Sequence, residues 1–174
     1  VDGGSLDGSI RVAESFSWAI IISSPAGRAK QMNAGAAKAR GRVLVFLHAD
    51  TFLPDDWPRQ VMKIVNQKNF GLGAFRFRLD HGAPAYRVIE WAVGIRCRFF
   101  NLPYGDQALF VKKNDFDRLG GYPDQPLMED VELVWGMKKQ GRIIILPHPA
   151  TSSARSWKRD GVYNRTMKNW KTYL

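Results

Sequence analysis

Short apolar runs bounded by turn residues recur along the chain and predict its strands. The clearest run covers residues 43–47 and ends at His48-Ala49-Asp50. An apolar run without alternation is typical of a strand covered on both faces, as in the parallel sheet of an α/β fold. Apolar or alternating segments also predict strands at 18–22, 71–80, 108–111 and 142–146.

Apolar residues at spacings of three and four predict the helices between these strands. In segment 86–100, Val88, Ala92, Ile95 and Phe99 follow one another at the spacings of one helix face. Strands that alternate with helices indicate an α/β fold: one domain over residues 1–174, with a mainly parallel sheet flanked by helices. Further helices are predicted at 10–16, 27–39, 56–66 and 128–139, with a helical turn at 115–119.

The composition is that of a soluble globular protein with a basic surface. Hydrophobic residues make up 45% and charged residues 24% of the 174 positions, and the formal net charge is +10. This charge favours an acidic partner, and nucleic acid, an anionic membrane or a phosphorylated substrate would each fit. The single cysteine, Cys97, lies in an apolar helical pattern, which predicts a buried thiol. One cysteine and no long apolar run favour a cytoplasmic location.

Asp50 is the leading candidate for chemistry because it directly follows the apolar run 43–47. In open α/β sheets, ligands bind at the carboxyl ends of the strands. A carboxylate there could bind a metal or a phosphate-linked group. It could equally end the strand in a turn that continues through Pro54, Asp55 and Asp56, and this stretch alone leaves both readings open.

Four separated segments of the chain read VDGGSLDGS, GRAKQMNAGAAKARGRVLVFLHADT, GDQALFVKKNDFDRLGGY and MEDVEL. Together they resemble family 2 glycosyltransferases with the GT-A fold. They are similar to the nucleotide-sugar turn, the metal-site strand, the acceptor-side loop and the catalytic-base helix of that family, and each is weak without the others. Within the family, the chain most resembles small bacterial enzymes with a His-Ala-Asp metal motif, a group associated with arsenosugar biosynthesis.

The resemblance implies an inverting, metal-dependent transfer of a sugar from a nucleoside-diphosphate sugar, with UDP or GDP, to a hydroxyl acceptor that the sequence does not identify. Asp50 would bind Mg²⁺ or Mn²⁺, hard cations that bridge phosphate oxygens. Asp2 would contact the base or ribose of the donor, with Ser5 nearby. Arg28 and Lys30 would lie beside the nucleotide, although a solvated helix face explains these two cations equally well.

The acceptor side of the implied site lies in the second half of the chain. By resemblance, Asp130 would be the general base that takes the proton of the acceptor hydroxyl. Acidic residues in a first helical turn are also favoured by the helix dipole alone. Glu129 would orient the acceptor, and the loop Gly105-Asp106-Gln107 would line the sugar and acceptor pocket.

Two features depart from the family pattern. The usual Asp-x-Asp is His48-Ala49-Asp50 here, so an imidazole replaces the carboxylate that commonly touches the ribose. His48 would either donate to a ribose hydroxyl or phosphate, or simply pack. The family also begins with a strand and a proline-containing loop that would precede Val1. We therefore expect a GT-A-type domain that lacks its first strand, with an unpaired edge or a gap in the sheet unless residues upstream of Val1 or another copy, as in a homodimer, supply the strand.

The segment 155–174 is predicted to be a basic amphipathic helix, with six Lys or Arg residues and one Asp. Its basic residues could close over the diphosphate, or it could contact the inner face of the membrane peripherally. A rival function is a non-catalytic basic module that binds nucleic acid or anionic lipid, although no recognised nucleic-acid motif is present. A second rival, a sugar nucleotidyltransferase, would need a glycine-rich, lysine-bearing phosphate loop that the sequence does not contain.

Overall fold

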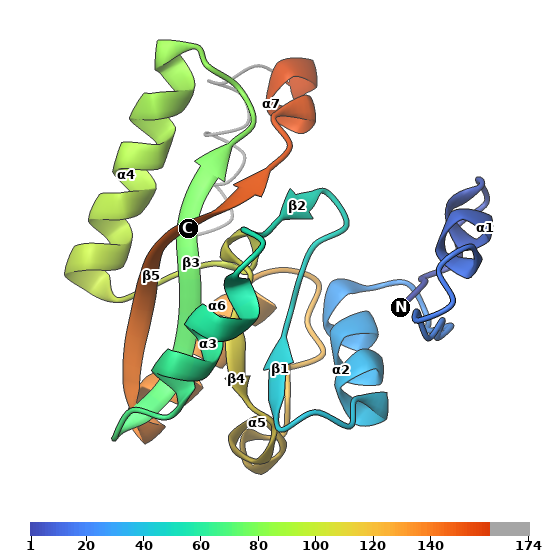
Figure 1. The fold of residues 1–174 in the computed structure, drawn as a ribbon, viewed down its shortest axis with the longest axis horizontal. Coiled ribbons are helices and arrows are strands. Elements are labelled where there is room, and N and C mark those ends of the chain that lie inside the picture. The colour runs from blue at the N-terminus through green and yellow to red at the C-terminus, as the bar shows by residue number, and fades with distance from the viewer. Residues whose placement is uncertain (161–174) are drawn as a thin grey trace.

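The computed structural model describes residues 1–160 (Figure 1). The predicted basic helix at 155–174 is described only over α7, and its remainder lies outside the described residues. None of the helices described is long and apolar enough to cross a membrane. The elements are α1 (Ser9–Glu14), α2 (Arg28–Lys38), β1 (Val43–Val45), β2 (Thr51–Phe52), α3 (Trp57–Val65), β3 (Phe70–Leu79), α4 (Pro84–Phe100), β4 (Phe110–Lys112), α5 (Lys113–Leu119), α6 (Glu129–Gln140), β5 (Arg142–Ser152) and α7 (Arg155–Asp160).

The strands form one 5-stranded sheet in the order β1-β4-β3-β5-β2. Among the described strands of this sheet, only β3 and β5 pair in parallel, and the β1–β4, β3–β4 and β2–β5 pairs are antiparallel. The expectation of a mainly parallel sheet was therefore wrong, and the sheet is mixed. The reason is that an apolar run reports burial and not strand direction: Leu44 and Phe46 are buried although β1 runs antiparallel to β4.

The predicted strand at 18–22 is not formed. At its end, Ser23 makes a single parallel bridge with Asp2, and the segment has no ladder partner within residues 1–160. Trp18 and Ile20 are consequently exposed by 79% and 76%. Strand β5 is the opposite case, because it continues from the predicted end at residue 146 to Ser152, with a register shift where Pro147 interrupts the pairing with β3.

The sheet curls, and this curl places the connection between β1 and β2. These two strands stand at opposite ends of the strand order, yet only residues 46–50 join them. The two ends of the sheet must therefore approach each other, and His48 and Asp50 lie in the turn between them. Helices α2, α5 and α6 contribute to the core on one face of the sheet, and α3 packs on the other face (Figure 1).

Helix α4 confirms the helix predicted at 86–100, but a different side of it is buried. Tyr86 and Cys97 face the protein interior, which confirms the buried thiol. The apolar stripe that identified the helix lies toward solvent, where Val88 is exposed by 63% and Phe99 by 71%. The helix thus carries apolar residues on two sides, and only one of these sides packs on the sheet.

Replacement of Gly73 by alanine is expected to lower the free energy of unfolding by about 2 kcal/mol, because the added methyl group overpacks the core. A Cβ at this position would lie 2.1 Å from the Phe110 ring. That ring is fully buried and packs against Phe70 and Phe75, so it has little room to move. Urea denaturation followed by circular dichroism measures the change.

The matched control is Gly94→Ala in α4, where an added Cβ meets nothing within 4 Å. Alanine in an open helical position should raise the unfolding free energy by about 0.5 to 1 kcal/mol. Equal effects of the two substitutions on the unfolding free energy would show that the core can accommodate a methyl group between β3 and β4 at position 73.

Candidate functional site

The carboxylate of Asp130 joins two segments that lie far apart in the sequence. One oxygen accepts a hydrogen bond from the amide of Gly105 at 2.7 Å, and the other accepts from the amide of Val131 at 2.9 Å. Asp130 lies in the first turn of α6, and Gly105 begins a short 3₁₀ turn before β4. The predicted base and the predicted acceptor loop are therefore in direct contact.

The His48 ring lies beside this contact. A Cβ built on Gly105 would lie 3.1 Å from His48 Nε2 and 3.5 Å from an Asp130 carboxylate oxygen, so only glycine leaves this space open. Burial of the ring and the nearby Arg28 guanidinium lower the pKa of His48, which favours the neutral imidazole. Its Nε2 is buried without a hydrogen-bond partner among the described residues.

Arg28 and Glu129 connect helices α2 and α6 at the same place. The Arg28 Nε lies 2.8 Å from a Glu129 carboxylate oxygen. The Glu129 side chain is only 2% exposed, whereas Arg28 is 50% exposed. Glu129 therefore holds the guanidinium at its inner edge and leaves the outer edge free to bind an anion.

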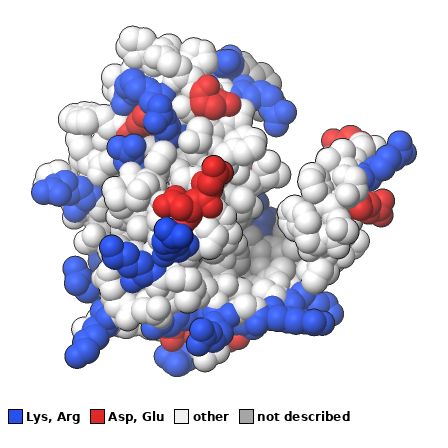
Figure 2. Space-filling view, viewed as in Figure 1, with Lys and Arg blue, Asp and Glu red and all other residues white. Residues whose placement is uncertain are grey.

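A cleft of about 680 Å³ runs between α2 and β1. Figure 2 shows the surface hollowed here, beside the projecting N-terminal segment. Arg28, His48 and Asp50 line one end of the cleft, and apolar side chains such as Met32 and Phe46 line the rest. The exposed carboxylate of Asp50 thus shares a cleft with a cation and an imidazole, which suits a ligand with both charged and flat apolar parts.

A divalent cation fits this cleft only if a ligand completes its coordination. No three His, Cys, Asp or Glu side chains within residues 1–160 are grouped to hold a metal ion. Among the residues that the structure describes, Asp50 is the one carboxylate that lines the cleft. Mg²⁺ is commonly held by one or two carboxylates together with substrate phosphates and water, so Asp50 suits such a site.

Asp106 is the most perturbed carboxyl group of the cluster. Burial, with a smaller contribution from the negative charge of Asp130, raises its pKa to about 6, and the nearby Arg96 opposes this shift. Its Oδ1 is buried and has no hydrogen-bond partner among the residues described. The sequence suggested Asp106 as a pocket residue but gave no sign that its carboxyl group would be buried.

Gln107 has a supporting position. It is 1% exposed, its amide nitrogen donates to the Phe75 carbonyl, and its amide oxygen accepts from Arg96 and from the Tyr104 amide. Arg96 also donates to the Leu102 carbonyl and stacks on the Tyr104 ring. Gln107 and Arg96 therefore fix the loop that presents Gly105. Arg96 was missed by the sequence reasoning because nothing distinguishes it from the other arginines of its helix.

Three of the proposed donor residues stand apart from this cluster. The Asp2 carboxylate accepts hydrogen bonds from Gly4 and Ser5, and the Ser5 hydroxyl is the main cause of its lowered pKa. The neighbouring Val1, and not Asp2, lines the cleft. Lys30 lies 3.7 Å from Asp124 at the surface, outside the cleft. Asp2 and Ser5 thus shape their own turn, and Lys30 faces another loop.

Unpaired buried polar atoms gather around Asp130. Buried polar atoms are nearly always hydrogen-bonded, so an unpaired group needs an explanation. His48 Nε2, Asp106 Oδ1 and the Tyr122 hydroxyl are each buried without a partner among the described residues. The negative charge of Asp130 also acts to raise the pKa of each of the three groups. This clustering is the pattern of a site that a ligand completes.

Comparison with known proteins adds one family match. The family model described as glycosyl transferase family 2 matches residues 1–122, which is more than half of the chain. This range contains His48, Asp50 and Gly105, and it ends before Asp130. No curated protein matches the chain.

Proposed function

The chain belongs to glycosyltransferase family 2, and we propose that it transfers a sugar from a nucleoside-diphosphate sugar to a hydroxyl acceptor with inversion at the anomeric carbon. Its mixed sheet with flanking helices fits a GT-A-like fold. The observation that carries the proposal is the contact of Asp130 with Gly105 beside His48. It brings three of the segments that resemble the family to one place.

The donor diphosphate is proposed to lie at the end of the cleft between α2 and β1. Arg28 would bind phosphate oxygens with the edge of its guanidinium that Glu129 leaves free. Asp50 would hold Mg²⁺ or Mn²⁺ together with the diphosphate. When bound, such an ion supplies positive charge that stabilises the departing diphosphate.

The neutral imidazole of His48 is proposed to take the place of the carboxylate that usually begins the Asp-x-Asp motif. Its unpaired Nε2 could donate to a ligand oxygen or accept from a ligand hydroxyl, depending on the tautomer. A hydroxyl of the sugar or ribose would satisfy this atom. The subgroup with a His-Ala-Asp motif would then share this arrangement.

Asp130 is proposed to act as the general base. The acceptor oxygen attacks the anomeric carbon on the face opposite the diphosphate, and its proton passes to the Asp130 carboxylate. The bond between the anomeric carbon and the diphosphate oxygen breaks, and its electron pair stays on the diphosphate. Gly105 and Val131 hold the carboxylate in place through their amides, so less conformational freedom is lost when the acceptor binds.

The donor site is tested by Asp50→Asn. UDP- and GDP-sugars are added with and without Mn²⁺, and the melting temperature is followed. A ligand at 100 times its Kd stabilises a protein by about 2.7 kcal/mol, or about 5 to 10 °C for a chain of this size. We expect the Mn²⁺-dependent part of this shift to disappear in the variant, because the exposed Asp50 carboxylate lines the cleft.

Asp55→Asn is the control, since Asp55 is also exposed and lies outside the cleft. It should keep the full shift. Salt-sensitive binding of DNA or vesicles that is indifferent to Asp50→Asn, without any response to nucleotide sugars, would favour the basic-module rival. Release of pyrophosphate instead of a nucleoside diphosphate would favour a nucleotidyltransferase.

A further inference from the structure

Helix α4 presents an apolar surface that no described element covers. This surface, called the α4 stripe below, consists of residues that recur along one side of the helix: Val88, Trp91, Ala92, Ile95 and Phe99. Val88, Trp91 and Phe99 are exposed by 63%, 68% and 71%. A contiguous group of large exposed apolar side chains on one element marks an interaction surface.

An arginine groove runs beside this stripe, between α4 and β3. Its volume is about 550 Å³, and the exposed side chains of Arg76, Arg78 and Arg98 line it together with Trp91 and Ile95. In Figure 2, basic side chains gather over the region where α4 lies beside β3 in Figure 1. None of these three guanidiniums has an ion pair or hydrogen bond within residues 1–160.

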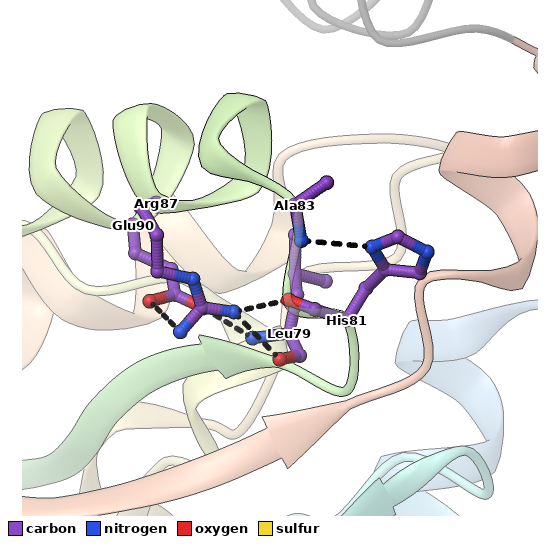
Figure 3. A network of polar contacts seen from close by, with 5 residues as sticks. All are labelled: Leu79, His81, Ala83, Arg87 and Glu90. Atoms are coloured by element: carbon purple, nitrogen blue, oxygen red, sulfur yellow. Dashed lines mark hydrogen bonds and ion pairs between the residues drawn. The ribbon is translucent and has the colours of Figure 1, made fainter.

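The acidic residue of the groove is already neutralised (Figure 3). Glu90 accepts from the Leu79 amide at 2.7 Å, and Arg87 pairs with it at 2.8 Å. Arg87 also donates to the carbonyls of Leu79 and His81. This network anchors α4 to the end of β3 and leaves the charge of Arg76, Arg78 and Arg98 uncompensated.

We propose that the α4 stripe and the arginine groove together dock on an anionic phospholipid surface. Amphipathic aromatic rings and arginine side chains are favoured at a membrane interface, where the apolar part lies among the acyl chains and the charge meets phosphate. The stripe runs along the 17-residue helix α4, so the helix can lie flat on the bilayer. The residues of this surface belong to α4 and β3, outside the sequence segment 155–174, and the proposal does not depend on the proposed sugar transfer.

Charge argues for a bilayer over a second copy of the chain. In a symmetric dimer, the same patch meets itself. The uncompensated Arg76, Arg78 and Arg98 of both copies would then be brought together in a partly desolvated interface, which costs free energy. An anionic lipid surface instead supplies the opposite charge at the border of the apolar stripe.

The test is co-sedimentation of the full chain with vesicles of phosphatidylcholine alone, or of phosphatidylcholine mixed with phosphatidylglycerol. We expect binding to the mixed vesicles only. Arg76→Gln/Arg78→Gln should weaken it about 25-fold, since each arginine near the surface contributes about fivefold. Trp91→Ser/Phe99→Ser should weaken it at least as much, because two large side chains no longer enter the bilayer.

Arg59→Gln/Arg142→Gln is the matched control. It removes two exposed arginines that do not line the groove, and it should weaken binding clearly less than Arg76→Gln/Arg78→Gln. All substituted side chains are exposed, so melting temperatures should stay close to that of the parent chain.

Three results would overturn the proposal. The first is vesicle binding that is equal in the groove, stripe and control variants. The second is a dimer in sedimentation experiments without lipid that Trp91→Ser/Phe99→Ser dissociates. The third is competition by inorganic phosphate at constant ionic strength with no effect of the stripe substitutions, which would make the groove a site for soluble anions.

Discussion

Asp130→Asn is expected to lower kcat by about 10² to 10⁴-fold while nucleotide-sugar binding is retained. The amide has nearly the shape of the carboxylate but cannot accept a proton from the acceptor hydroxyl. Binding of the donor should change little, because the proposed donor contacts are Arg28, His48 and Asp50 at the cleft. Initial rates with a donor sugar and an acceptor screen measure kcat, and the melting shift with donor measures binding.

The two hydrogen bonds of Asp130 call for a stability measurement beside the kinetics. Its oxygens accept separately from Gly105 and Val131, and asparagine has only one acceptor oxygen. The variant should therefore lose about 1 kcal/mol of unfolding free energy, far too little to explain a loss of turnover by unfolding.

The variant Glu132→Gln distinguishes a catalytic role of Asp130 as base from a structural role in stabilising the helix dipole. Glu132 lies in the same first turn of α6 and is exposed. If acidic residues serve there only to stabilise the helix, the two substitutions should have similar and small effects on turnover. A kcat of Asp130→Asn equal to that of Glu132→Gln would remove Asp130 from the role of base.

The resemblance predicted that separated segments share one site, and this juxtaposition was easier to predict than the sheet that produces it. Asp50, Gly105 and Asp130 stand in segments whose order resembles the family, and the structure brings the segments around His48, Gly105 and Asp130 into contact. Strand direction was predicted wrongly because burial of Leu44 and Phe46 requires covered faces and not a parallel neighbour. The pairing partner of a strand depends on chain segments that no local pattern describes.

Helix α4 shows a second limit of pattern analysis. A period of 3.6 residues identifies an apolar side, but α4 has two such sides. Tyr86 and Cys97 pack inward, and the more regular stripe of Val88 and Phe99 remains outside. Which side packs depends on the shape of the sheet beneath it, and this shape follows from long-range pairing.

The burial of Asp106 could not be predicted from the sequence either, and it leads to an expected pH dependence of stability. Its pKa is raised from 3.8 to about 6, mainly by burial. The native carboxyl group therefore binds its proton more tightly than the unfolded one does. Its contribution to stability is full below about pH 4 and is lost as the pH rises through about 6.

Asp106→Asn should remove this loss because an amide does not ionise. Relative to the parent chain, the variant should gain about 3 kcal/mol of unfolding free energy between pH 4 and pH 8. Urea denaturation at both pH values measures the gain. Asp55→Asn, which removes an exposed carboxylate, controls for the general effect of charge on a basic protein and should show a much smaller difference.

If the two variants gain equally, the Asp106 carboxyl group is hydrated and does not belong to a closed cluster beside Asp130. If only Asp106→Asn gains, the native protein keeps an unpaired, partly desolvated carboxyl group at this position at a cost in stability, as is common for groups that act on a ligand.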